Sequence, residues 1–168
     1  MQRRSLLKLG AASAAVLLVA GGAAALLQPG LAGGVLSASG REVFSGVGRA
    51  VLDKTLPADE GARQIALNGL LSRVDILVQG LPPHAQAELS QLLALLANAA
   101  GRRALAGLDQ PWRQASIADI QQSLQNMRLS GLVLRQQAYA ALHDITAGAY
   151  FSDPASWALL GYPGPLKI

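Results

Sequence analysis

The sequence predicts an all-α protein: a small helical bundle, preceded by an N-terminal signal or hydrophobic helix and followed by an extended C-terminal tail rich in proline, glycine and aromatic residues. Three observations predict this class. Apolar residues recur every three to four positions over long segments, proline and glycine separate these segments, and no segment alternates apolar and polar residues as a strand does. The 168 residues are enough for one domain with a modest core once a leader is set aside.

Residues 1–32 predict an export leader. The chain begins Met-Gln-Arg-Arg-Ser-Leu-Leu-Lys, which resembles the twin-arginine translocation motif, usually written Ser/Thr-Arg-Arg-x-Phe-Leu-Lys, with glutamine and leucine as two departures. The residues that match the motif are Arg3, Arg4, Leu7 and Lys8. The uncharged residues 9–27, rich in alanine and glycine, follow. The resemblance implies that the twin-arginine translocase carries the already folded protein to the periplasm, so the chain meets the membrane at least transiently through its leader.

Two fates of this leader stay open. Cleavage after Ala32 would make residues 1–32 a signal peptide, residues 33–40 a glycine-rich linker and residues 41–168 the helical domain. Alternatively, residues 9–27 would anchor the protein in the inner membrane, because about 20 apolar residues can span a bilayer.

The charge balance argues against nucleic acid as a partner. The formal net charge is +4, from 14 Lys and Arg against 10 Asp and Glu. Three of the positive charges belong to the leader, so the body is nearly neutral and shows no basic stripe. The body contains one pair of adjacent basic residues, Arg102–Arg103, which is expected to be solvated at a helix end. The chain has no cysteine, which excludes disulfides, thiolate metal sites and a haem attached through Cys-x-x-Cys-His.

The first half of the body predicts three helices. Each has an apolar stripe of helical period, and each is closed by a residue that breaks helices. They cover residues 41–56, 60–81 and 84–100, with Gly101 closing the last. The buried face expected for the second helix consists of Leu67, Leu70, Leu71, Val74, Leu77, Val78 and Leu81.

The second half predicts a loop and two further helical segments. Residues 106–115 contain glycine and proline and predict the loop. Ser116 and Asp119 then resemble a capping box before an apolar run, which predicts that a helix begins there. Ser130–Gly131 is expected to kink or break this helix before residues 132–150 resume it.

The titratable side chains give little support for catalysis. Only His84 and His143 could act as bases near neutral pH. His84 follows two prolines in a first helical turn and is expected to be exposed, whereas His143 lies one turn after Tyr139 and is expected to be a partly buried structural residue. The chain also lacks the His-x-x-x-His, Glu-x-x-His and Gly-x-Ser-x-Gly patterns. We therefore expect no catalytic residue, no metal site and no cofactor held by this chain.

Aromatic residues gather near the C-terminus. Five of the seven lie within 24 positions: Tyr139, Tyr150, Phe151, Trp157 and Tyr162. Proline and glycine follow at a density that cannot continue a helix, which predicts an extended or turned tail. The aromatic residues either cap the core of the bundle or anchor an interface, since Trp and Tyr are common interface anchors. Both roles stay open.

The same residues resemble the ending of the gluconate 2-dehydrogenase subunit 3 family. Family endings often run Thr-x-x-Gly-(Phe/Tyr)-(Phe/Tyr)-x-Asp-Pro, then a Gly-Gly-Asn insert, then Trp-x-x-Ile-Gly-(Phe/Tyr)-Pro-Gly. Residues 143–154 here are His-Asp-Ile-Thr-Ala-Gly-Ala-Tyr-Phe-Ser-Asp-Pro, and Trp157 and the Gly-Tyr-Pro-Gly of residues 161–164 follow without the insert. The tail and the resemblance together predict these partner-binding residues: Tyr150, Phe151, Asp153, Pro154, Trp157, Tyr162 and Pro163.

Members of that family are small, twin-arginine-led helical subunits of periplasmic FAD-dependent alcohol and sugar dehydrogenases. The resemblance implies a noncatalytic accessory subunit that binds, stabilises and co-exports a folded flavin subunit of the glucose–methanol–choline (GMC) type, which would hold the FAD. A cytochrome c subunit would carry electrons onward in complexes that contain one. The alternative is a membrane-anchored helical periplasmic protein that tethers another partner.

Overall fold

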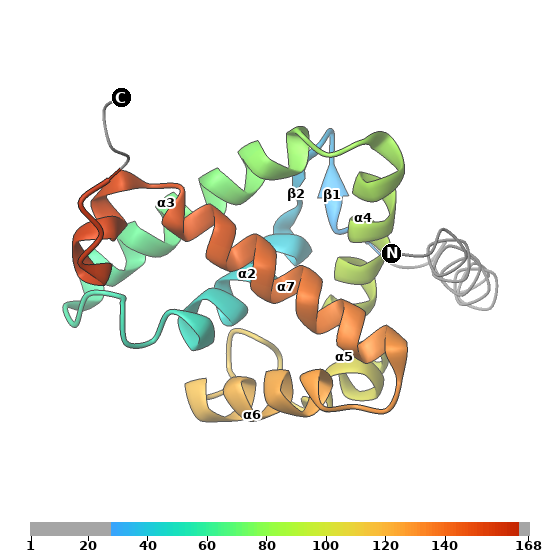
Figure 1. Ribbon diagram of the computed structural model, residues 1–168. Coiled ribbons are helices and arrows are strands. Elements are labelled where there is room, and N and C mark those ends of the chain that lie inside the picture. The colour runs from blue at the N-terminus through green and yellow to red at the C-terminus, as the bar shows by residue number, and fades with distance from the viewer. Residues whose placement is uncertain (1–27, 165–168) are drawn as a thin grey trace.

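The structure, a computed structural model, describes residues 28–164, and this part of the chain is mostly α-helical, as the sequence predicts (Figure 1). Residues 1–27 of the predicted leader lie outside the described part, and they include Arg3, Arg4, Leu7, Lys8 and the apolar run 9–27. None of the described helices is both long and apolar enough to cross a membrane. The α-helices are α2 (Ala38–Val51), α3 (Glu60–Gln79), α4 (Pro83–Ala97), α5 (Ala99–Ala106), α6 (Ile117–Arg128) and α7 (Val133–Phe151), and the 3-10 helix η1 (Pro154–Leu160) follows.

Polar side chains start several of these helices. Ser116 accepts the backbone N–H of Asp119 at 3.1 Å and hydrogen-bonds to its carboxylate at 2.7 Å, so the helix start predicted there is confirmed. Ser37 and Asp59 cap α2 and α3 by accepting backbone N–H groups. At the other end of α5, Gly107 adopts a φ of 66° and closes the helix in the left-handed conformation that glycine favours.

Helix α2 lies at the centre of the bundle and packs against α3, α4, α6 and α7 (Figure 1). Two glycines allow this close packing. A Cβ at Gly46 would lie 3.1 Å from the Cβ of Trp112, and a Cβ at Gly48 would lie 2.7 Å from a methyl carbon of Leu70. The fully buried apolar residues of α2 are Val43, Phe44 and Val47.

The loop between α5 and α6 places Trp112 in the core. Its indole is fully buried, and the indole N–H donates to the carbonyl of Leu96 on α4 at 2.8 Å. Arg49 on α2 donates to the carbonyl of Trp112 at 2.7 Å. The loop predicted from glycine and proline is therefore tied to two helices through one residue.

The segment expected to be a glycine-rich linker is folded. Leu31–Ala32 (β1) and Val35–Leu36 (β2) form an antiparallel hairpin, and α2 begins at Ala38, earlier than expected. Gly33 and Gly34 make the turn with φ of 60° and 80°, the conformation that a two-residue hairpin turn requires. Strands of two residues are too short to show an alternating pattern, which is why the sequence predicts no strand here.

The hairpin is anchored to α4 and α3. The backbone N–H groups of Gly30 and Leu31 donate to the carbonyl and the hydroxyl of Ser90, each at 3.1 Å. The N–H of Leu36 donates to the carboxylate of Asp75 at 2.7 Å. Both leucines are buried. The expected cleavage point lies between the two strands and would divide this folded element.

Helix α4 is shorter than expected, and another helix follows it. Asn98 accepts the backbone N–H of Ala100 at 2.9 Å and starts α5 directly after α4 ends at Ala97. Gly101 therefore lies inside α5 instead of closing α4. Its lack of a side chain is needed, because a Cβ there would clash with the backbone of Leu95.

Arg102 is buried, although the sequence predicts that the basic pair is solvated. It donates to three backbone carbonyl groups, those of Ala97, Leu108 and Asp109. These bonds satisfy the guanidinium away from water and tie α5 to the loop that follows it. Arg103 is exposed and pairs with the carboxylate of Asp109 at 3.1 Å, as expected of a surface residue.

Removing the first strand of the hairpin should destabilise the domain. A chain that begins at Gly33 lacks the buried side chain of Leu31 and two hydrogen bonds to Ser90. We expect its free energy of unfolding to lie about 2–3 kcal/mol below that of a chain that begins at Gln28. Urea unfolding followed by circular dichroism measures the difference. Ala32→Ser, at an exposed position, is the control, and equal stability of the two chains would contradict a structural role for β1.

Candidate partner-binding surface

The C-terminal segment begins with a short helix where the sequence predicts an extended tail. Asp153 caps η1, Pro154–Leu160, by accepting the backbone N–H of Ala155 at 3.0 Å. Proline fits the first turn of a helix because the N–H that it lacks has no helical partner there. Gly161, with a φ of 67°, ends the helix, and residues 162–164 continue without helix or strand.

Two of the predicted partner-binding residues pack into the bundle. Tyr150 is 6% exposed, and its hydroxyl donates to the carbonyl of Thr55 at 3.2 Å. Phe151 is half-buried against the core and meets Tyr150 edge-on, with ring centroids 5.2 Å apart. These two aromatic residues therefore cap the core, which is one of the two roles that the sequence leaves open.

Trp157 and Tyr162 form an aromatic pair after α7. Their ring centroids lie 5.4 Å apart, with the ring planes at 63°. The indole N–H of Trp157 donates to the carbonyl of Phe151 at 2.8 Å, and the N–H of Tyr162 donates to the carbonyl of Trp157 at 3.1 Å. Tyr162 is 50% exposed, and Pro154 and Pro163 are exposed as well. The segment therefore presents aromatic and proline side chains to solvent from a fixed backbone.

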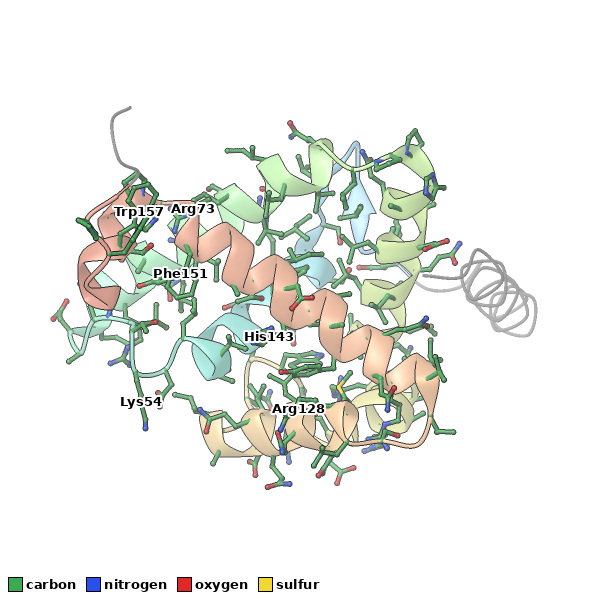
Figure 2. All side chains as sticks on the ribbon, viewed as in Figure 1. Lys54, Arg73, Arg128, His143, Phe151 and Trp157 are labelled. Atoms are coloured by element: carbon green, nitrogen blue, oxygen red, sulfur yellow. The ribbon has the colours of Figure 1, made fainter. Side chains whose placement is uncertain are left out.

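Arg73 on α3 links this segment to the bundle. Its Nε–H donates to the carbonyl of Ala149 at 2.8 Å, and its Nη1 donates to the carboxylate of Asp153 at 3.1 Å. Gly69 makes room for the guanidinium, because a Cβ there would lie 3.3 Å from Nη1. Figure 2 shows Arg73 and Trp157 at the same end of the molecule. Sequence reasoning missed Arg73, because its partner Asp153 lies 80 residues away along the chain.

Helix α3 carries apolar side chains on its outer face as well as its inner one. Most of the predicted stripe is buried, but Leu77 is 40% exposed, and Ile65 and Ile76 are more exposed still. A Cβ at Gly148 of α7 would lie 3.9 Å from a methyl carbon of Leu77, so Leu77 borders the seam between α3 and α7. A second group of exposed apolar side chains follows α6: Leu129, Leu132 and Val133.

The two histidines lie as the sequence predicts. His84 is exposed, and His143 is half-buried. The imidazole of His143 stacks on Tyr139 with ring centroids 5.3 Å apart, and its Nδ1 lies 3.0 Å from the carboxylate of Asp144. Within residues 28–164 the structure shows no group of three His, Cys, Asp or Glu side chains that could hold a metal ion.

A cleft of about 910 Å³ lies between α2 and the first half of α3. Side chains of both charges line it, and three of its arginines have partners within the chain: Arg41 pairs with the carboxylate of Asp75, and the other two are Arg49 and Arg63. Arg49 donates to the carbonyl of Trp112, and Arg63 pairs with Glu60 at 3.0 Å. This arrangement is typical of a solvated groove between helices.

Comparison of the chain with protein-family models, with curated proteins and with solved structures finds no match. The resemblance to the gluconate 2-dehydrogenase subunit 3 family therefore depends on two groups of residues, the leader motif and the C-terminal residues 143–164. Only the second group lies in the described part of the chain, where it forms the end of α7, the helix η1 and the aromatic pair.

The burial of the aromatic residues predicts two different responses to substitution. Tyr150→Ala should lower the free energy of unfolding by about 3 kcal/mol or more, because it leaves a cavity in the core and removes the hydrogen bond to Thr55. Tyr162→Ala should lower it by less than about 1 kcal/mol, because that ring is half exposed. Chemical unfolding of the isolated subunit measures both. Equal effects would contradict the division into core and surface residues.

Proposed function

We propose that the protein is a noncatalytic accessory subunit that binds, stabilises and co-exports a folded FAD-dependent dehydrogenase subunit of the GMC type. Its place would be the periplasm, reached through the twin-arginine translocase. The observation that carries this proposal is the aromatic pair of Trp157 and Tyr162, which lies in the segment that resembles the family and is held in one conformation by hydrogen bonds.

The chemistry of the pair suits a protein partner. Trp and Tyr offer large rigid contact areas and are enriched among residues that dominate binding energy. A segment that is already ordered loses little conformational entropy when it docks, so more of the contact energy remains as affinity. Pro154 and Pro163 restrict the backbone on either side of the pair. We therefore assign partner contact to these four residues, and core capping to Tyr150 and Phe151.

The leader accounts for the export half of the proposal. A flavin subunit binds FAD in the cytoplasm and must cross the membrane folded, which the twin-arginine route permits. A subunit that binds it there and carries Arg3 and Arg4 would supply the address for both chains. The FAD would belong to the partner, and a cytochrome c subunit would join complexes that contain one.

A second candidate function is favoured by the length of the uncharged run. Residues 9–27 form an apolar segment close to the length that spans a bilayer. In this case the protein would stay in the inner membrane and tether another periplasmic partner. Carbonate extraction of membranes distinguishes the two candidates, because a processed subunit is released and an anchored one is retained.

Replacing both leader arginines should stop export of the pair. In a host that makes both subunits, Arg3→Lys with Arg4→Lys should leave dehydrogenase activity in the cytoplasm, because the partner has no address of its own. Ser5→Ala, at the variable position of the motif, is the control. Activity is measured in periplasmic and cytoplasmic fractions. Undiminished periplasmic activity in the double variant would refute co-export.

Truncating the half-buried Trp157 should weaken the complex. Trp157→Ala should raise the Kd for the purified FAD-containing subunit about 30-fold, because an anchor residue commonly contributes about 2 kcal/mol. Isothermal titration calorimetry measures the change. Leu129→Ala removes an exposed apolar side chain after α6, far from η1 along the chain, and should bind as the wild type does. Wild-type affinity of Trp157→Ala would place the contact surface elsewhere.

A further inference from the structure

A chain of hydrogen bonds runs from α3 to the start of η1. Arg73 is half-buried and donates to two groups, the carbonyl of Ala149 in the last turn of α7 and the carboxylate of Asp153. The second oxygen of that carboxylate accepts the N–H of Ala155 in the first turn of η1. One guanidinium therefore fixes the end of α7 and the beginning of η1 relative to each other.

The position of the aromatic pair follows from this junction. The carbonyl of Asp153 accepts the N–H and the hydroxyl of Ser156 at 2.9 and 2.7 Å, and Ser156 is buried. Trp157 comes next, and its indole N–H reaches back to the carbonyl of Phe151. If the start of η1 moved away from α7, Trp157 would lose its bond to the carbonyl of Phe151, and Tyr162 would move with it, because the N–H of Tyr162 is bonded to the carbonyl of Trp157.

We infer that Arg73 is a positioning residue for partner binding: through Asp153 it holds η1 in place and presents Trp157 and Tyr162 in the orientation that docks. This inference rests on the proposed function. Arg73 lies outside the motif that resembles the family, and its hydrogen bonds within residues 28–164 go to Ala149 and Asp153 and to neither ring. Its role is to order the binding segment before the partner binds, so that less conformational entropy is lost on binding.

The geometry requires arginine at this position. The planar guanidinium donates in two directions at once, to a carbonyl and to a carboxylate, whereas a lysine ammonium is a point charge on a flexible stem. Arg73→Lys keeps the charge but cannot hold both partners in the same way. Arg73→Lys should therefore show the same change in quenching and affinity as Arg73→Gln. If attraction between charges were sufficient, Arg73→Lys would instead resemble the wild type.

Tryptophan fluorescence reports the order of the segment in the isolated subunit. The chain has two tryptophans, and Trp112 is fully buried, so acrylamide quenching reports mainly Trp157. Arg73→Gln should raise the quenching constant while the helical circular dichroism and Tm stay close to those of the wild type. Arg63→Gln is the matched control on the same helix, because the partners of Arg63 are Pro57, Ala58 and Glu60.

Binding then tests whether the order matters for the partner. Arg73→Gln should raise the Kd for the purified FAD-containing subunit about tenfold, because the segment must be ordered on binding. Arg63→Gln should bind as the wild type does. Asp153→Asn is the second variant: it removes the charge that pairs with Arg73 but keeps an oxygen for the N–H of Ala155. If Arg73→Gln lowers the Tm, the quenching and affinity of Asp153→Asn decide the outcome.

The outcomes separate this inference from the proposed function. Unchanged quenching in both Arg73→Gln and Asp153→Asn overturns the inference, and so does raised quenching with wild-type affinity. A wild-type subunit that binds no FAD-containing dehydrogenase overturns the proposed function itself, whatever the quenching shows. Raised quenching together with weaker binding, and with Arg63→Gln unchanged in both, is the result that supports Arg73 as the positioning residue.

Discussion

The contact between Trp112 and Gly46 is the constraint on which the rest of the bundle depends. Because glycine has no side chain, Trp112 lies directly against α2. Its indole N–H donates to the carbonyl of Leu96 on α4, and its backbone carbonyl accepts a hydrogen bond from Arg49 on α2. The loop before α6 is thereby fixed at the centre, and α6 and α7 follow it along the chain. Even an alanine at Gly46 would bring its Cβ to 3.1–3.3 Å from Trp112, so the tryptophan would have to shift by a few tenths of an ångström.

The C-terminal surface is built on this frame. Helix α7 packs along α2 and α3, and Tyr150 closes the end of the core by bonding to Thr55 after α2. The chain then leaves the core, and the bonds of Arg73 on α3 to Ala149 and Asp153 fix the position of the segment that follows α7. One aromatic group, Tyr150 with Phe151, therefore packs on the core, while the next consists of the half-buried Trp157 and the exposed Tyr162. The sequence places these residues within a few positions of each other, but only the fold separates their roles.

Helices and caps could be predicted because their causes are local. The apolar period predicts the helices, and the pair Ser116–Asp119 predicts the start of α6. Both predictions are confirmed, since each signal involves residues that are close together in the sequence. The hairpin turn at Gly33–Gly34 also has a local signal, two adjacent glycines, but in a glycine-rich run that signal resembles a linker. The prediction that Gly101 closes a helix is wrong. Glycine is common at helix ends, but it also occurs inside helices where a neighbouring backbone comes close, and the sequence does not distinguish the two. Arg73 could not be found at all, because its pairing with Asp153 exists only after α3 and α7 have packed together.

The proposed function requires the segment around Tyr162 to touch a flavin dehydrogenase subunit. The most direct measurement is site-specific photocrosslinking, with a benzophenone amino acid in place of Tyr162 and, separately, of Leu129, in cells that make both subunits. We expect a covalent adduct with an FAD-containing polypeptide from position 162 and none from position 129. An adduct from position 129 alone, or no adduct from position 162 in a complex that can be purified intact, would contradict this expectation.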